Sequence, residues 1–316
     1  MNNIKILILF YIKMILNYWS IFIIYMLYIN NSLLSKKLVG NANTMFYLKG
    51  KNDLISQCII STKTKKDICD KEAKLYLREN EFIKDKKLIS ISPGGFKGFY
   101  LLGITTFIKE NYNLDNFIYS GASAGAWNSL FMCYKKNPMD FVCNLLDYNI
   151  QKSKNINDLQ YLIKYKLLSS YKEDDFDLNR LFIGVTSIKN FTPKTNIYSD
   201  FSSLDDAINC CIASSHIPLV TGGFTNRYNN MYSFDGGFSN YPYLDFENHI
   251  FHIYPSIWND IEGKNKNINC LKKYTEIFSI SKNNLLHLFD DGYQDAKKHK
   301  SYLDTIFISS NETIIL

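Results

Sequence analysis

The fold class is decided by residues 116–134, which read NFIYSGASAGAWNSLFMCY. The run begins with apolar, β-prone residues and ends with the apolar density of a helix. Between them stands GASAG at residues 121–125, which matches the pattern G-x-S-x-G. A serine in this pattern, between a strand and a helix, sits on a strained turn that only small neighbours permit. We therefore expect Ser123 to be a nucleophile, with Gly121 and Gly125 making room for the turn.

A second strand, turn and helix precede this stretch. Residues 88–92 read LISIS, residues 93–98 read PGGFKG, and residues 99–108 read FYLLGITTFI. Backbone N–H groups of such a loop, together with the start of the helix, form an anion site. The loop fits neither a Walker A motif nor G-x-G-x-x-G, because Phe96 stands where a glycine is required. It therefore argues against a nucleotide site, and a plain structural turn remains the alternative to an anion site.

A third element supplies a carboxylate. The short β-prone run MYSF, residues 231–234, is followed by Asp235, Gly236 and Gly237. Asp-Gly by itself is typical of a hairpin turn. A serine nucleophile needs a base within hydrogen-bond reach, and a carboxylate on a glycine turn can approach without obstruction. Asp235 is therefore the candidate base.

In that order, the three elements resemble the patatin-like phospholipase family. The family carries D-G-G-G-x-R-G, then G-x-S-x-G, then D-G-G or D-G-A, and the matching residues here are 92–98, 121–125 and 235–237. Residues 212–221 (IASSHIPLVT) are similar to the family's Ala-Ser-x-x-x-Pro stretch. Residues 285–298 (LLHLFDDGYQDAKK) are similar to its late helix with a Gly-Tyr-x-Asp-Ala core. The resemblance covers about residues 87–300.

The resemblance implies a three-layer α/β/α domain with a mostly parallel central sheet. It also implies a phospholipase A type reaction, in which Ser123 attacks a fatty-acyl ester, Asp235 takes the proton, and an acyl-enzyme forms. The oxyanion would be held by the loop and the elbow, at Gly94, Gly95, Lys97, Gly98 and Ala124. No metal and no organic cofactor is implied. The expected partners are a phospholipid or other acyl lipid and a membrane surface.

Two departures from the family pattern concern the loop. Ser92 and Pro93 replace the usual Asp-Gly, and Lys97 replaces the more common arginine. Proline has no N–H, so one possible oxyanion donor is missing. Loss of one such donor costs roughly 10² to 10³ in rate, so a slow enzyme is one expectation. Lys97 keeps a positive charge but not the planar fork of arginine.

Two other interpretations stay open from the sequence. A Ser-His-Asp esterase would need a histidine after the acid, as His249, His252, His287 or His299 could provide. His216 precedes Asp235 and Ile217-Pro218, where we expect a pocket wall. The altered loop also allows a catalytically weak, membrane-anchored lipid-binding protein on the same fold. The intact Ser123 and Asp235 favour the enzyme.

Composition excludes several other classes. Hydrophobic residues make up 46% and charged residues 21% of the 316 residues, as in a globular protein. The net charge of +6 is spread along the chain, which argues against nucleic-acid binding. Seven cysteines occur without C-x-x-C, and neither His-x-His nor H-E-x-x-H is present, so no metal or redox motif is indicated. The sequence does not indicate an oligomeric state.

The chain divides into three expected parts. Residues 1–40 contain the uncharged run MILNYWSIFIIYMLYI at residues 14–29, which predicts a hydrophobic anchor or a signal segment. A buried core helix is the third possibility for this run. Residues 41–84 are polar and lysine-rich and predict a linker with helical segments. Residues 85–316 form the expected hydrolase domain. Because of the hydrophobic run in residues 1–40, the protein is predicted to associate with membranes through its N-terminal segment.

Overall fold

The computed structural model describes residues 68–69, 71–153, 155–189, 192–218, 220–239, 241–263 and 284–308. All of them lie in the compact unit Lys65–Leu316. The hydrophobic segment expected in residues 1–40 lies outside the described residues, and the boundaries at residues 40 and 84 stay predictions. Among the helices that are described, none combines the length and apolarity needed to cross a membrane.

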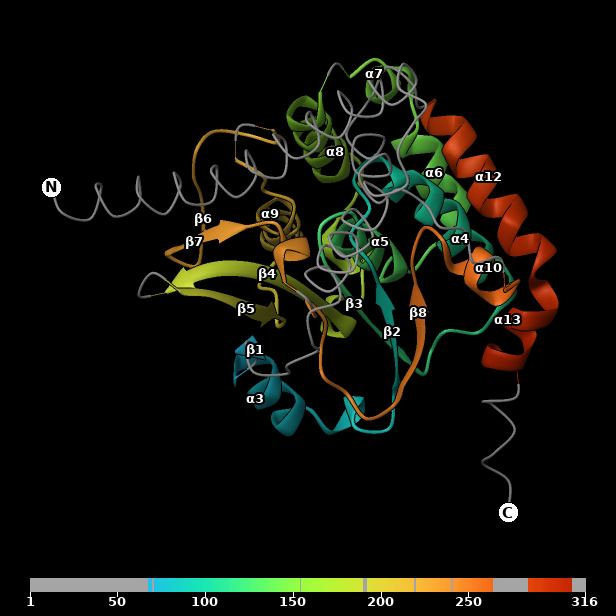
Figure 1. Ribbon diagram of the computed structural model, residues 1–316, viewed down its shortest axis with the longest axis horizontal. Coiled ribbons are helices and arrows are strands. Elements are labelled where there is room, and N and C mark those ends of the chain that lie inside the picture. The colour runs from blue at the N-terminus through green and yellow to red at the C-terminus, as the bar shows by residue number, and fades with distance from the viewer. Residues whose placement is uncertain are drawn as a thin grey trace, which may run out of the picture. The chain divides into compact units, whose positions relative to one another are not determined.

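The described strands form one eight-stranded sheet with the order β1-β5-β4-β3-β2-β8, to which β7 and β6 are added beside β4 (Figure 1). Their bounds are β1 Ile68–Cys69, β2 Lys87–Ile91, β3 Phe117–Gly121, β4 Leu181–Lys189, β5 Thr192–Tyr198, β6 Asn226–Tyr228, β7 Met231–Phe234 and β8 His249–Ile253. The strands predicted around residues 88–92, 116–120 and 231–234 are confirmed.

The sheet is mixed, which corrects the expectation of a mostly parallel one. Strands β4, β3, β2 and β8 are parallel neighbours, and so are β1 and β5. Strand β4 is antiparallel to both β5 and β7, and β6 is antiparallel to β7. Parallel neighbours need a crossover, which the helices between β2, β3 and β4 provide. Only two residues separate the end of β4 from the start of β5, which is too short for the crossover that a parallel pair needs, so this pair has to be antiparallel.

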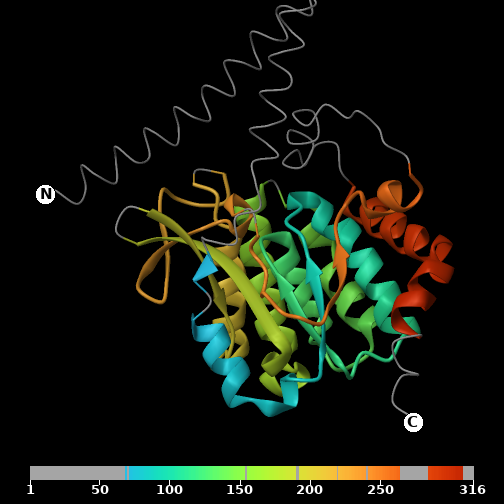
Figure 2. The same ribbon diagram turned by 60° about the horizontal axis from the view of Figure 1, so that its bottom comes forward.

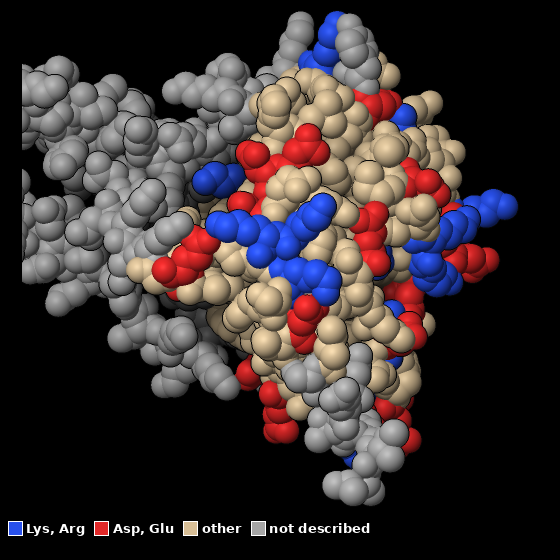
Figure 3. Space-filling view, turned by 90° about the vertical axis from the view of Figure 1, so that its right-hand side faces the viewer, with Lys and Arg blue, Asp and Glu red and all other residues tan. Residues whose placement is uncertain are grey.

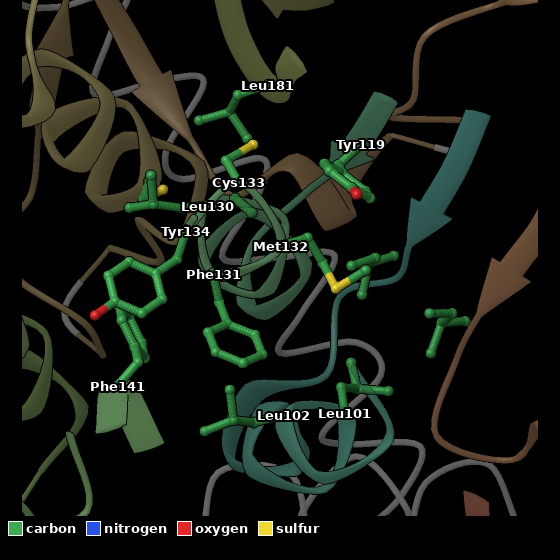
Figure 4. Packing of buried hydrophobic residues seen from close by; sticks show 14 of the residues in the cluster. Leu101, Leu102, Tyr119, Leu130, Phe131, Met132, Cys133, Tyr134, Phe141 and Leu181 are labelled. Atoms are coloured by element: carbon green, nitrogen blue, oxygen red, sulfur yellow. The ribbon is translucent and has the colours of Figure 1, made fainter. Parts of the chain in front are cut away.

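One face of the sheet carries the larger core. Helices α4 (Gly98–Asn111), α5 (Ala124–Met132) and α9 (Leu204–Ser214) cover it. Ile89, Tyr119 and Leu181 are register partners on three adjacent strands, and all three are fully buried in this core. Between the helices, Phe131 on α5 points toward Leu102 on α4, as Figure 4 shows.

The other face has a smaller core and little helix. Leu88 and Ile118 are register partners on this face, and Phe182 lies on it as well. They pack with residues of α3 (Lys71–Glu79), of the 3₁₀ turn Glu81–Ile83 and of the chain before β8, such as Leu244. The expected three layers are therefore uneven, because one short helix and an extended segment form the third.

The remaining helices lie beyond this framework. They are α6 (Pro138–Leu145), α7 (Tyr148–Gln151), α8 (Ile156–Ser170), α10 (Ile257–Ile261), α12 (Leu285–Lys298) and α13 (Lys300–Phe307), with 3₁₀ turns at Glu173–Asp175 and Leu178–Arg180. An asparagine or serine before α6, α8, α9 and α12 accepts a first-turn N–H through its side chain, which explains where each begins.

The late helix predicted at residues 285–298 is confirmed as α12, and it packs on the outer side of α4 (Figures 1 and 2). Asp295 accepts a hydrogen bond of 2.6 Å from the Tyr100 hydroxyl of α4. Gly292 and Ala296 are buried in the same contact. The Gly-Tyr-x-Asp-Ala core of this helix therefore stabilises the fold and lies away from the candidate site.

Charges of both signs are mixed on the face that carries α12 and α13, as Figure 3 shows. Lys298 pairs with Glu262 at 2.9 Å, and Lys300 pairs with Asp304 at 2.8 Å. This surface therefore presents no large field of one sign to a polyanion.

Candidate active site

Ser123 lies on a sharp turn between β3 and α5. Its backbone has φ 54° and ψ −126°, a left-handed conformation that strains any residue other than glycine. The flanking Ala122 and Ala124 are small and buried. The strained elbow predicted from G-x-S-x-G is therefore present, and the Ser123 side chain is only 7% exposed.

Asp235 directly follows β7, which is antiparallel to β4 and ends near the elbow. The Ser123 Oγ donates a hydrogen bond of 2.6 Å to Asp235 Oδ2. The other oxygen, Oδ1, accepts the N–H of Gly237 at 2.7 Å. Gly236 is needed between them, because a Cβ there would lie 2.4 Å from the Gly184 carbonyl oxygen. The tertiary structure thus brings together two side chains that are 112 positions apart.

The environment of Asp235 suits a base. Burial raises the pKa of Asp235 from 3.8 to about 6, while the hydrogen bonds from Ser123 and Gly237 act in the opposite direction. Removal of the carboxylate from water disfavours its charged form. With its pKa at about 6, the carboxylate is still mostly ionised at pH 7 and holds a proton more readily than an exposed aspartate does.

The glycine loop forms a 3₁₀ turn, Gly95–Lys97, that leads into α4. Gly95 has φ 53°, which glycine adopts at little cost. The N–H of Lys97 donates to the Gly94 carbonyl at 3.0 Å, and that of Gly98 donates to the carbonyls of Gly95 and Phe96. The N–H groups of Lys97 and Gly98 therefore serve the turn itself.

Gly94 and Gly95 remain the loop donors in our interpretation. No side chain caps the 3₁₀ turn, and a helix start leaves its first N–H groups without an intrahelical partner. The same holds at Ala124, where α5 begins without a side-chain cap. Gly95, Ala124 and Ser123 line one pocket.

The first departure in the loop, at Ser92 and Pro93, makes structural contacts. Ser92 pairs through its N–H with the Ile253 carbonyl of β8 at 2.9 Å, and its hydroxyl donates to the Pro93 carbonyl at 3.0 Å. The Pro93 ring lies beside Gly237, at 3.2 Å from where a Cβ on that glycine would stand. The proline therefore packs against the turn that carries Asp235.

A pocket of about 110 Å³ opens at Ser123 and Asp235. Helices α4, α5, α6 and α8 provide most of its wall, which is apolar and aromatic. The apolar wall residues are Phe96, Phe99, Leu102, Trp127, Phe131, Phe141, Leu145, Ile156, Leu159, Ile163, Leu167 and Ile217. At about 110 Å³ the pocket is smaller than an apolar cavity of about 150 Å³ that binds benzene, so as it stands it has room for only a few methylene groups.

Phe131 and Phe141, which line the pocket, belong to a cluster of packed aromatic rings. The rings of Phe131 and Phe141 lie 5.0 Å apart, and those of Tyr134 and Phe141 lie 5.2 Å apart (Figure 4). Tyr171 and Phe176 complete this cluster. The sequence alone gave no means of assigning helices α6 and α8 to the pocket.

Asn128 is a site residue that sequence reasoning missed. It is buried on α5, and its Nδ2 donates to the carbonyls of Gly98 at 3.0 Å and Ala124 at 2.9 Å. It therefore joins the glycine loop to the elbow. An asparagine inside the otherwise apolar helix AGAWNSLFM was the available signal.

The rings of the five histidines, all of them described, make no bond to the dyad of Ser123 and Asp235. His249 and His252 both contact the buried Ser90 hydroxyl, at 2.7 and 2.6 Å. His299 contacts Glu262, and His287 is exposed on α12. His216 is buried next to the site, and burial lowers its pKa. In the part of the chain that is described, no histidine ring bonds to Ser123 or Asp235.

Within the described ranges, no group of three or more His, Cys, Asp or Glu side chains is arranged to hold a metal ion.

One family model and several solved structures match the chain. A family model described as patatin-like phospholipase matches residues 89–246, half of the chain. No curated protein sequence matches the chain. VipD from Legionella pneumophila matches with 12% identity and a TM-score of 0.32, over 66% of this chain and 67% of that one. The ExoU–SpcU complex from the type III secretion system of Pseudomonas aeruginosa matches with 13% identity and a TM-score of 0.35, over 69% of this chain and 52% of that one.

Proposed function

We propose that this chain, which belongs to the patatin-like phospholipase family, hydrolyses fatty-acyl esters of lipids through a Ser123–Asp235 dyad. The observation that carries the proposal is the 2.6 Å hydrogen bond from Ser123 Oγ to Asp235 Oδ2 at the mouth of an apolar pocket. A nucleophile, a base and a hydrocarbon-sized pocket in one place fit ester hydrolysis of a lipid.

The first half of the reaction forms an acyl-enzyme. As the Ser123 oxygen bonds to the ester carbonyl carbon, its proton passes to Asp235. The carbonyl oxygen becomes an oxyanion, and the N–H groups of Gly94, Gly95 and Ala124 stabilise it, together with the positive end of the α5 dipole. The carbon–oxygen bond to the alcohol then breaks, and the alcohol leaves with the proton from Asp235.

The second half regenerates the serine. Asp235 accepts a proton from a water molecule that attacks the acyl carbon, and the same N–H groups hold the second oxyanion. Collapse of this intermediate releases the fatty acid, and the proton returns to the Ser123 oxygen. A carboxylate with a pKa of about 6 can both accept and return this proton near neutral pH.

The substrate class follows from the family and the pocket. We propose a phospholipid as substrate, with one acyl chain entering the apolar wall between α4, α5 and α8. Binding of the protein to a membrane surface, through the hydrophobic segment in residues 1–40, is part of the same proposal. A Ser-His-Asp mechanism is the weaker alternative, since the rings of His249, His252 and His299 bond to other groups.

The test uses the full chain, a fluorophosphonate probe and phospholipid vesicles. Wild type is compared with Ser123→Ala, Asp235→Asn and each of the five histidines changed to alanine. We expect labelling and fatty-acid release to vanish with Ser123→Ala, to collapse with Asp235→Asn and to survive every histidine change. Loss with one histidine change would favour the triad. A wild type that binds vesicles but neither labels nor hydrolyses would favour lipid binding without catalysis, as the missing donor at Pro93 allows.

A further inference from the structure

The end of α9 holds the elbow through one hydroxyl. Ser214, the last residue of α9, is fully buried. Its Oγ accepts the backbone N–H of Ser123 at 2.8 Å and donates to the Gly184 carbonyl of β4 at 2.6 Å. Both hydrogen bonds are buried, and in the low dielectric of the interior they are stronger than they would be in water. Ser214 therefore ties the strained residue to the centre of the sheet.

The same segment also holds Asp235. Two residues after Ser214, the His216 carbonyl accepts the backbone N–H of Asp235 at 2.7 Å. The Gly184 carbonyl, which accepts the Ser214 hydroxyl, also lies directly against Gly236. Both proposed dyad residues are thus fixed through their backbone N–H groups to one short stretch of chain.

That stretch is itself rigidly closed. The Thr221 hydroxyl accepts the Ile217 N–H at 2.7 Å and donates to the Ser215 carbonyl at 2.8 Å. The Ser215 hydroxyl accepts the Trp127 Nε1–H of the pocket wall at 3.0 Å. Together with the bond from Ser123 to Ser214, these contacts hold residues 214–217 against the elbow and the pocket wall.

Ser214 is not a second nucleophile. Its proton is donated to a carbonyl oxygen, which cannot remove it, and its oxygen is occupied by the Ser123 N–H. The same bond also removes the Ser123 N–H from the set of oxyanion donors. The hydroxyl therefore has a geometric role only.

We propose that Ser214 is a positioning residue for the hydrolysis. By holding the Ser123 N–H, it fixes the left-handed turn that aims Ser123 Oγ at Asp235, while the His216 carbonyl holds the other side of the pair. This inference rests on the proposed function. A displacement of about 1 Å in a reacting group can cost about 10²-fold in rate, which sets the expected size of the effect.

The matched control is Ser120→Ala. Ser120 is also fully buried and its hydroxyl also accepts a backbone N–H, that of Leu244 at 2.9 Å, but it lies on the opposite face of the sheet. Replacing Ser120 or Ser214 with alanine removes the same kind of hydrogen bond. Only the change at Ser214 concerns the elbow.

The experiment compares full-chain wild type, Ser214→Ala, Ser214→Cys and Ser120→Ala. It measures kcat and KM on phospholipid vesicles, the rate of fluorophosphonate labelling, and hydrogen exchange of the Ser123 and Asp235 amides. We expect Ser214→Ala to lower kcat and the labelling rate about 10²-fold with KM changed less than about twofold. The acidic limb of the pH profile should not move, because Ser214 transfers no proton. The Ser123 amide should exchange with solvent faster in Ser214→Ala than in wild type. Ser120→Ala should leave kcat and the labelling rate within about twofold of wild type.

Three outcomes would overturn the inference. One is an equal loss of rate in Ser214→Ala and Ser120→Ala, and another is an unchanged exchange rate at Ser123. If Ser214→Ala does not fold, Ser214→Cys decides, and a folded cysteine variant with wild-type kcat would refute the inference. A wild type that neither labels nor hydrolyses would instead refute the proposed function, and the exchange data would still test the contact.

Discussion

Replacement of Asp235 by asparagine should stabilise the folded protein at neutral pH while it abolishes hydrolysis. Burial raises the pKa of Asp235 from 3.8 to about 6 in the folded state, so folding favours the neutral carboxyl. For a carboxyl with a raised pKa, the stabilising contribution is complete below about pH 4 and is lost as the pH rises through about 6. The contribution of Asp235 to the free energy of unfolding of wild type therefore falls as the pH rises from about 4 to above about 6. Asparagine is neutral throughout.

The magnitude follows from the pKa. A difference of about two pKa units, at about 1.4 kcal/mol each, corresponds to about 3 kcal/mol. Asparagine can accept through only one oxygen, so the variant gives up one of the hydrogen bonds that Ser123 and Gly237 make to Asp235, at a cost of about 1 kcal/mol at every pH. We expect the variant to be about 1 kcal/mol less stable than wild type at pH 4 and about 2 kcal/mol more stable at pH 7.

Urea unfolding of the full chain, followed by tryptophan fluorescence at pH 4 and pH 7, measures this difference. Asp290→Asn is the control, because Asp290 is exposed on α12 and its carboxylate is not removed from water by folding. A difference between wild type and Asp235→Asn that is the same at both pH values would refute the reasoning. It would mean that burial does not disfavour the carboxylate at this position.

Three other predictions follow from the site. The kcat/KM for a neutral ester should fall about tenfold per pH unit below about pH 6, because protonated Asp235 cannot accept the serine proton; a flat profile from pH 5 to 7 would contradict this. Gly95→Ala should cost about 1–2 kcal/mol in urea unfolding, because φ is 53° there, and it should lower kcat; an unchanged unfolding free energy would show that the loop relaxes. Ile163→Trp should narrow the pocket and lower kcat/KM for long-chain p-nitrophenyl esters more than for short-chain ones. Equal losses on both esters would mean that the acyl chain of the substrate does not enter the pocket beside Ile163.

Much of the site could be predicted from the sequence because its chemistry depends on local backbone conformation. GASAG requires small residues around a strained serine, and the strand and helix on either side are visible in the apolar pattern. The structure has these elements as β3 and α5. The loop PGGFKG and the turn at Asp235 were recognised in the same way.

Other features depended on contacts between distant parts of the chain. The mixed sheet arises because β5 and β7 both pair with β4 in the antiparallel direction, which apolar patterns alone do not reveal. Asn128 and Ser214 looked like ordinary residues of apolar helices, and only the fold places them against the loop and the elbow. The pocket wall is formed by α4, α5, α6 and α8, which are separate along the chain.

The sequence by itself determined the α/β class, the elbow at Ser123, the glycine loop and the candidate base at Asp235, because each of these depends on the conformational limits of a few adjacent residues. The tertiary structure decided the 2.6 Å approach of Ser123 to Asp235, the raised pKa of that carboxyl and the apolar pocket beside it. Distance, burial and desolvation are set by which elements pack together, and residues that are 112 positions apart in the chain carry no local signal of their contact.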